Sequence, residues 1–66
     1  MPMRRLRAVA LVPGDLFRPV GVDVPFAVVD DVELDGCGSA ALRVHTTEGG
    51  AVCLEFGSQV YVLIAP

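Results

Sequence analysis

Apolar and polar residues alternate with a period of two over residues 40–46 and again over residues 52–56. Successive side chains of a β-strand point to opposite sides, so this alternation predicts two strands that each bury one face. Between them, residues 48–50 predict a three-residue hairpin loop in which Gly50, at the last position, takes the left-handed backbone conformation. The second half of the chain therefore predicts an antiparallel hairpin.

The length of this loop fixes which side chains face each other across the hairpin. On the inner face, the predicted pairs are Leu42 with Phe56 and Val44 with Leu54. On the outer face, they are Arg43 with Glu55 and His45 with Cys53. A two-residue loop would instead place Val44 opposite a residue of the polar face, which the pattern disfavours.

The first twenty residues predict two extended segments. Residues 4–12 form a strand, or a strand followed by a single helical turn. The Pro-Gly-Asp sequence at 13–15 ends this segment, because proline presets φ and glycine permits a positive φ. Residues 16–20 form a short extended piece, which Pro19 confines to a sheet edge or a bulge since proline has no amide hydrogen to donate.

The longest predicted strand covers residues 24–34. Its predicted inner face consists of Phe26, Val28, Val32 and Leu34. Its predicted outer face consists of Ala27, Val29, Asp31 and Glu33. Asp30 is a charge in phase with the inner face, so we expect the strand to bend there or to reach the rim of the sheet. Residues 35–39 form the loop that follows.

A last strand is predicted over residues 60–64, after a turn at 57–59 and before Ala65 and Pro66. Its two faces are both apolar, and Tyr61 and Leu63 occupy one of them. Such a strand is typically covered on both sides. In so small a domain, we expect a second chain to supply one of the two covers.

The order of these elements resembles the Src-homology-3-like small barrels. The resemblance rests on the Leu-Val-Pro-Gly-Asp turn at 11–15, the tight hairpin and the short turn before a closing strand. It implies an all-β, five-stranded and partly open barrel formed as one domain by residues 1–66. It does not extend to the aromatic groove for proline-rich peptides, because the chain has no tryptophan and a single tyrosine.

Two further resemblances are weaker. The Leu-x-Pro-Gly-Asp turn, together with a composition in which every basic residue is arginine, resembles short actinobacterial and actinobacteriophage proteins. In outline the chain is also similar to the Sm-like fold, but the long amino-terminal helix of that fold is not evident here.

Composition bears on assembly. Apolar residues make up 53% of the 66-residue chain, and the mean hydropathy is +0.59. Soluble domains typically have an apolar fraction of ~45–50% even with glycine included, and a domain this short has a thin core. The excess predicts a face or a strand edge that a second copy or a partner covers.

The charges are distributed unevenly along the chain, whose net charge is −3. Four of the five basic residues precede position 19, namely Arg4, Arg5, Arg7 and Arg18. Seven of the eight acidic residues follow them, and four of these are grouped: Asp30, Asp31, Glu33 and Asp35. The overall balance disfavours nucleic-acid binding, which depends on many cations, and leaves the four arginines as a local basic arm.

The two cysteines are Cys37 and Cys53. The amino-terminal sequence lacks the apolar stretch and cleavage site of a secretory signal, and no apolar run approaches the ~18 residues of a membrane span. We therefore expect a cytoplasmic protein without a membrane segment, in which both thiols are free.

The candidate chemical groups match no catalytic or metal motif. Cys37, His45 and Cys53 are the only soft ligands, whereas a structural zinc site takes four. The acidic group lacks the spacing of a calcium loop, and a barrel this small offers no sizeable cleft between carboxylates. No helix follows the glycine-rich turns, so they are not phosphate cradles. We expect no catalytic residue, no metal and no cofactor.

The leading hypothesis is a non-enzymatic protein–protein interaction module that forms a homo-oligomer or docks on a larger protein through strand edges. A phage-encoded regulator of a host protein would be one such module. The residues predicted to contact the partner are Tyr61, Leu63, Asp31 and Glu33. One alternative is a weak nucleic-acid-binding barrel that uses Arg4, Arg5, Arg7 and Arg18. Another is a minor structural component of a virion.

Overall fold

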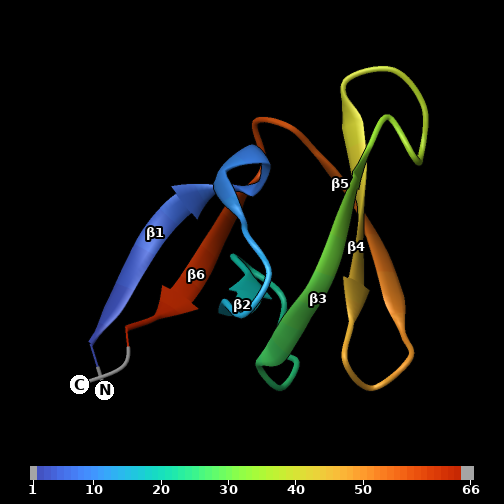
Figure 1. Cartoon of the computed structure of the whole chain (residues 1–66). Coiled ribbons are helices and arrows are strands. Elements are labelled where there is room, and N and C mark those ends of the chain that lie inside the picture. The colour runs from blue at the N-terminus through green and yellow to red at the C-terminus, as the bar shows by residue number, and fades with distance from the viewer. Residues whose placement is uncertain (1, 65–66) are drawn as a thin grey trace.

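The computed structural model describes residues 2–64 of the chain. They form six strands and one 3-10 turn, namely β1 (Met3–Arg7), η1 (Ala8–Ala10), β2 (Leu16–Pro19), β3 (Ala27–Leu34), β4 (Ala41–Thr46), β5 (Ala51–Glu55) and β6 (Gln59–Leu63). The strands pair antiparallel in one open sheet of order β1-β6-β2-β3-β4-β5 (Figure 1). The all-β class is confirmed, but the sheet has six strands rather than five because residues 16–19 pair as a strand. No helix within the described residues is long and apolar enough to cross a bilayer.

The sheet bends between β2 and β3 into two halves. These strands pair only through Leu16 with Val28 and Phe17 with Ala27, and Figure 1 shows β1 and β6 set apart from β3, β4 and β5. Both halves and the segment between β1 and β2 contribute to one core, which consists of Ala8, Leu11, Phe17, Val29, Leu42, Val44, Val60 and Val62. The halves therefore bury their inner faces against each other and leave their outer faces to solvent.

The amino-terminal segment takes the second of its two predicted forms, a strand followed by a single helical turn. The turn at 13–15 is confirmed. Gly14 has a φ of +96°, and the Val12 amide donates to the Asp15 carboxylate at 3.0 Å.

Residues 16–20 were predicted at a sheet edge or a bulge because of Pro19, but β2 as a whole lies between β6 and β3. The Val20 amide donates to the Gln59 carbonyl of the segment that pairs with β2, at 3.1 Å. Since amides alternate in direction along a strand, the nitrogen of Pro19 faces the β3 side, where pairing has already ended at Phe17. Pro19 is tolerated inside the sheet because it stands where β2 has one neighbour.

The predicted bend at Asp30 is confirmed, because the pairing of β3 with β4 shifts register between Val29 and Asp31. The assignment of faces was wrong before this bulge. Val29, predicted on the outer face, is 1% exposed, since one extra residue inverts the phase of alternation. Leu34, predicted on the inner face, is 62% exposed at the end of β3. Phe26 precedes the strand rather than belonging to it.

The hairpin of β4 and β5 has the predicted inner face. Leu42 and Val44 are buried, and the inner residues of β5 pack against the core. The predicted register was wrong by two residues, since Leu42 pairs with Leu54 and Val44 with Val52. The outer pairs change with it, so that Arg43 faces Cys53 and His45 faces Ala51.

The loop of the hairpin has the predicted length but lies one residue earlier. The Thr46 amide donates to the Gly50 carbonyl at 2.9 Å, which leaves residues 47–49 as the loop. Gly49, with a φ of +89°, takes the left-handed position that was predicted for Gly50. The Gly50 amide also donates to the Thr46 hydroxyl at 3.2 Å, and this bond favours the observed closure.

The closing strand is confirmed as β6, between β1 and β2. Val60 and Val62 are buried in the core, whereas Tyr61 and Leu63 are half-buried on the outer face. Ala65 and Pro66, which were predicted to follow the strand, lie outside the described residues, as does Met1. The second face of β6 is therefore only partly covered within this chain.

Candidate functional site

β1 and β5 form the two ends of the sheet, and each has an edge with unpaired main-chain groups. At the carboxyl end of β5, the Val9 amide of η1 donates to the Phe56 carbonyl at 3.3 Å, so the free edge of β5 lies before Phe56. The Phe56 amide donates to the Ala40 carbonyl at 2.9 Å, so the even-numbered residues around β5 face β4. The main-chain groups of Ala51 and Cys53 consequently point away from the sheet. On β1, the Ala8 amide donates to the Ser58 carbonyl at 2.6 Å, which turns the odd-numbered residues of β1 to the free side in the same way.

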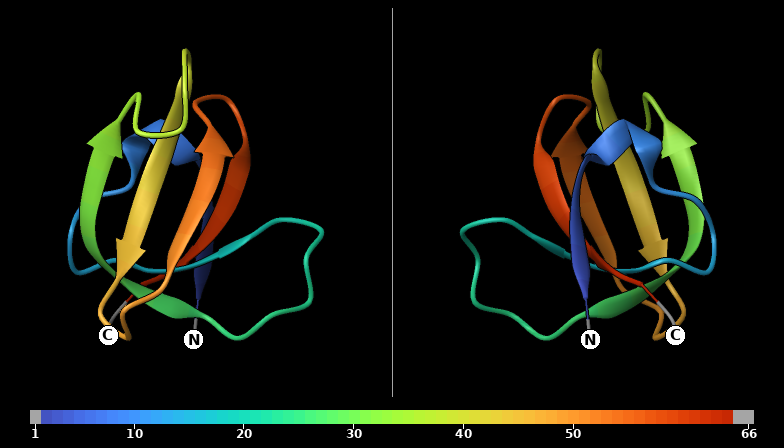
Figure 2. Two further views of the ribbon diagram at one scale, coloured as in Figure 1. Left: turned by 90° about the vertical axis from the view of Figure 1, so that its right-hand side faces the viewer. Right: turned by 90° about the vertical axis from the view of Figure 1, so that its left-hand side faces the viewer.

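An apolar groove of about 500 Å³ lies beside the edge of β5, and we call it the edge groove. One wall is β5 itself, through Ala51, Val52 and Leu54, and the other is the 20–26 loop, through Val22, Val24 and Pro25. Figure 2 shows this loop projecting from the body of the molecule. Val22 is 47% exposed and Val24 is 40% exposed. The projecting loop thus presents aliphatic side chains to solvent.

Both ends of the 20–26 loop are fixed to the sheet. At one end, Val20 donates its amide to the Gln59 carbonyl at 3.1 Å. At the other, the Arg18 guanidinium lies over the Phe26 ring at 4.6 Å from its centroid. A cation–π contact at an exposed position contributes about 0.5–1 kcal/mol. The wall of the edge groove is therefore anchored where the loop leaves the sheet and where it returns to β3.

A second surface gathers three of the four amino-terminal arginines, and we call it the arginine face. It consists of Arg5, Arg7, Arg18 and Tyr61 on the outer side of β1, β6 and β2. Arg5 and Arg18 are both direct cross-strand partners of Tyr61. Arg5 donates to the Tyr61 hydroxyl at 3.2 Å, and its guanidinium lies 5.5 Å from the ring centroid. Leu63 follows Tyr61 on the same side of β6.

Arg4 is not part of this surface. It is the cross-strand partner of the buried Val62, so its side chain starts on the other face of β1. Arg4 and Asp15 both line a separate hollow of about 390 Å³. Three of the four arginines proposed for nucleic acid therefore lie together, and the fourth does not.

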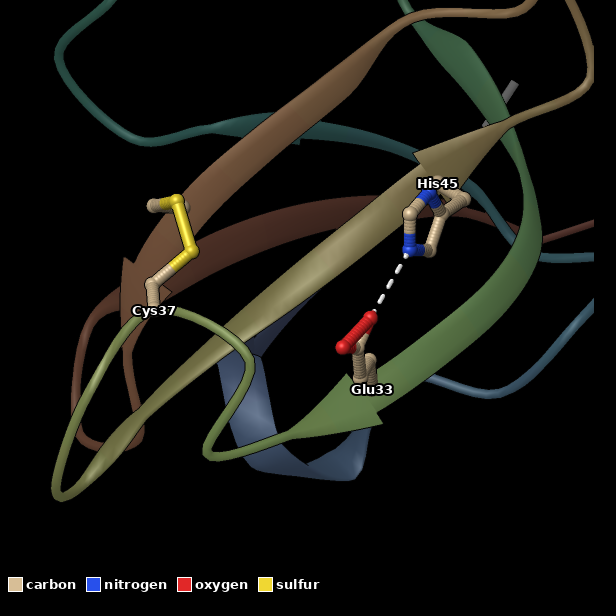
Figure 3. The surroundings of a disulfide bond; sticks show 4 residues. Glu33, Cys37 and His45 are labelled. Atoms are coloured by element: carbon tan, nitrogen blue, oxygen red, sulfur yellow. Dashed lines mark hydrogen bonds and ion pairs between the residues drawn. A yellow bond between two sulfur atoms is a disulfide. The ribbon is translucent and has the colours of Figure 1, made fainter.

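The residues predicted to bind a protein partner lie on two different surfaces. Tyr61 and Leu63 belong to β6, whereas Asp31 and Glu33 lie on the outer face of β3, opposite His45 and Arg43. The Glu33 carboxylate contacts the His45 imidazole at 3.4 Å (Figure 3). β2 separates β6 from β3 in the sheet, so these four side chains do not form a single patch.

Opposite charges occupy the two halves of the sheet. The half formed by residues 2–26 and 59–64 carries four arginines and two aspartates, a net charge of +2. The other half, residues 27–58, carries one arginine and six carboxylates, a net charge of −5 when His45 is neutral. Among residues 2–64, no arginine lies within 4.0 Å of a carboxylate, and the contact of His45 with Glu33 is the one between a basic side chain and a carboxylate. The arginines are thus available to a charged group outside the described chain.

The expectation of two free thiols is wrong, because Cys37 and Cys53 form a disulfide (Figure 3). Their Cα atoms are 5.9 Å apart and 16 positions separate them in sequence. The bond ties the loop after β3 to β5, the strand that forms one wall of the edge groove. It also removes both thiolates that could have joined His45 as soft ligands. Cytoplasmic localisation stays a prediction, and it loses the support of free thiols.

The carboxylates and the histidine do not assemble into a metal site. Over the described part of the chain, no three His, Cys, Asp or Glu side chains are close enough to hold an ion together. The acidic group at 30–35 is exposed to solvent, apart from Val32 within it. Asp30, Asp31 and Glu33 of this group lie on the strand β3 and form part of a charged, solvent-exposed surface of the sheet.

Comparisons of the chain with protein-family models, curated proteins and solved structures found no match. The candidate surfaces are therefore defined by this chain alone. Sequence reasoning missed Val24 and Pro25 because it assigned residues 24–34 to one strand, and it missed Val22 because it assigned residues 21–23 to no element. A signal was present, since Gly21 and Pro25 bracket this segment and both residues favour loops over strands.

Proposed function

We propose that this protein is a non-enzymatic interaction module that binds an extended protein segment along β5. The observation that carries the proposal is the edge groove, in which an apolar wall stands directly beside unpaired main-chain groups. An extended segment that adds to a sheet edge gains main-chain hydrogen bonds, and pockets for alternate side chains give specificity. Both components are present at β5.

The chemistry of the groove indicates what kind of segment it favours. Its lining residues carry no charged side chain, and Val22, Val24 and Val52 supply aliphatic contact. We therefore expect a segment whose alternate side chains are apolar. An exposed edge of this kind would otherwise promote unspecific pairing between chains, and the 20–26 loop limits access to it from one side.

The architecture we propose for the module is a small barrel of Src-homology-3 type. The bend of the sheet at β2 and β3, the tight β4–β5 hairpin and the short turn before β6 support this. Because a fold of this kind serves many functions, the interaction surface rests on the edge groove and not on the architecture.

A selection of random displayed peptides on the purified protein tests the proposal. Ala51→Pro removes an outward-facing amide of β5 without breaking a hydrogen bond inside the sheet, and proline is tolerated on edge strands. We expect the selected peptides to alternate apolar residues and to bind the Ala51→Pro protein at least about tenfold more weakly, since one strand hydrogen bond and its geometry are lost. Arg5→Pro, the same change on the β1 edge, is the matched control and should leave peptide binding unchanged. Equal binding to both proline variants, or no selected peptide, would contradict the proposal.

A second candidate function is supported by the arginine face. Single-stranded nucleic acids bind surfaces that combine cations with an aromatic ring for base stacking, and Arg5, Tyr61 and Arg18 form such a row. The test is the fluorescence anisotropy of a labelled single-stranded oligonucleotide at increasing salt. Binding that weakens with salt and is lost in the Arg5→Ala/Arg18→Ala protein would support this function. Absence of binding to the unaltered protein would exclude it.

A further inference from the structure

We infer that the segment bound along β5 is β1 of a second copy of this chain, so that copies associate head to tail. The inference rests on the proposed function and names the partner of its groove. Two properties of the molecule carry it, namely the match between the two free edges and the opposite charge of the surfaces that flank them.

The two free edges match in length and in the direction of their main-chain groups. β1 and β5 each have five residues, and in both strands the odd-numbered residues point outward, as the hydrogen bonds of Ala8 and Phe56 require. A fully overlapped antiparallel pairing sets Arg5 of one copy opposite Cys53 of the other. On the inner face, the same register sets Leu6 opposite Val52 and Arg4 opposite Leu54. Leu6 and Val52 are both apolar, and the aliphatic stem of Arg4 covers Leu54 while its guanidinium stays in water.

The charges favour this pairing over the symmetric alternatives. Arg5 and Arg7 lie on the outer face of β1, and Glu55 lies on the outer face of β5. In the overlapped register, Arg5 of one copy is the diagonal neighbour of Glu55 of the other, within reach of long side chains. Pairing β5 with β5, or β1 with β1, would bring together halves of equal charge, which is unfavourable.

The contact also covers apolar surface that a single copy leaves open. Val22 and Val24 in the wall of the edge groove are 47% and 40% exposed. A second copy at β5 would contact these aliphatic groups. Because the contact joins different surfaces, each copy keeps one free edge, and the assembly grows into a ring or an open chain.

Sedimentation velocity over a range of protein and salt concentrations tests the inference with the full chain. We expect a mass that rises above the monomer with protein concentration and falls with salt. Arg5→Glu and Glu55→Arg should each weaken association about tenfold, because each replaces an attraction by a repulsion. A mixture of these two variants should recover association, since each contact between unlike copies then brings a glutamate next to an arginine. Asp30→Arg is the control for Glu55→Arg, because it makes the same change of charge at an exposed position of β3, a strand inside the sheet.

Other outcomes separate the inference from the proposed function. An unaltered protein that stays monomeric but still binds displayed peptides overturns the head-to-tail inference alone. A dimer that does not grow further and persists in the Arg5→Glu protein overturns it as well, because β1 then makes no contact. Loss of both peptide binding and association in Ala51→Pro, with an unchanged circular dichroism spectrum, supports the use of one edge for both. If Arg5→Glu does not fold, Glu55→Arg tests the same contact from the β5 side.

Discussion

Replacing Cys37 and Cys53 by serine removes the cross-link between the loop after β3 and β5. The bond closes a loop with a sequence separation of 16 residues. For a loop of this length, the chain-entropy model gives about 3 kcal/mol of stabilisation at 25 °C, through a smaller conformational entropy of the unfolded chain. A 66-residue domain has a free energy of unfolding of roughly 3–10 kcal/mol in total. The double serine variant should therefore lose about a third or more of its stability.

The same loss appears as a lower melting temperature. With an unfolding entropy of ~2.1 cal/mol/K per residue, a loss of about 3 kcal/mol corresponds to a decrease of about 20 °C. Thermal melts followed by circular dichroism measure it for the oxidised protein, the reduced protein and the double serine variant. We expect the last two to coincide within a few degrees, because both lack the cross-link.

Reduction of the bond supplies the control. A reductant should lower the melting temperature of the unaltered protein and leave that of the double serine variant unchanged. Intact mass spectrometry of the purified protein should give a mass two hydrogen atoms below that of the dithiol form. A dithiol mass after purification under air, or a double serine variant that melts with the unaltered protein, would refute the assignment of the disulfide as a stabilising bond.

Four further substitutions test the core and the turns by urea denaturation. Leu42→Ala should lower the free energy of unfolding by about 2–5 kcal/mol, because Leu42 is fully buried. Its cross-strand partner Leu34 is 62% exposed, so Leu34→Ala should change the free energy of unfolding by less than about 0.5 kcal/mol. Equal effects of the two substitutions would contradict the observed burial. Gly36→Ala should lower the free energy of unfolding by about 1–3 kcal/mol, because the added Cβ would lie 3.0 Å from the Cβ of Arg43. An unchanged urea midpoint would show that neighbouring atoms move to relieve this contact. Gly49→Val should lower the free energy of unfolding by about 1–3 kcal/mol, because Gly49 has a φ of +89°, which a valine rarely adopts. An unchanged free energy of unfolding would indicate that residue 49 is not the left-handed position of the hairpin loop.

The inner face of the hairpin was predictable because it depends only on local alternation. Leu42 and Val44 are buried, as the pattern requires. The register was not predictable from the same signal, since loops over 47–49 and 48–50 place the same side chains inside. The choice between them depends on hydrogen bonds of Thr46 with Gly50, and a binary pattern does not contain this information.

The sequence located the bend of β3 correctly, but the prediction did not exchange the inner and outer faces of the residues before the bend. Asp30 stands at the position where a core residue was due, and the sheet does have its irregularity there. A bulge adds one residue to one strand, so the faces on its two sides are out of phase. A single phase drawn through residues 24–34 therefore placed Val29 on the wrong side.

The edge groove could not be predicted from the sequence, because its two walls come from segments that are far apart in the chain. Val22 and Val52 meet only after β2 and β3 have turned the sheet back on itself. The disulfide was missed for a related reason, since the inference about Cys37 and Cys53 came from the expected compartment and not from their positions. The distance between them is set by the loop after β3, which folds onto β5.

The clustering of charge along the sequence becomes a difference in charge between the two halves of the sheet only through the topology. The amino-terminal strand pairs with the carboxyl-terminal strand β6, which carries no ionisable side chain other than Tyr61. In the strand order, β1 and the acidic strands β3, β4 and β5 consequently lie at opposite ends, and no carboxylate of the described chain lies within 4.0 Å of an arginine of β1. The open order of the sheet leaves the outward main-chain groups of β1 and β5 to a partner. For the head-to-tail association that we propose, exchange of the two charges between copies is the change that tests it.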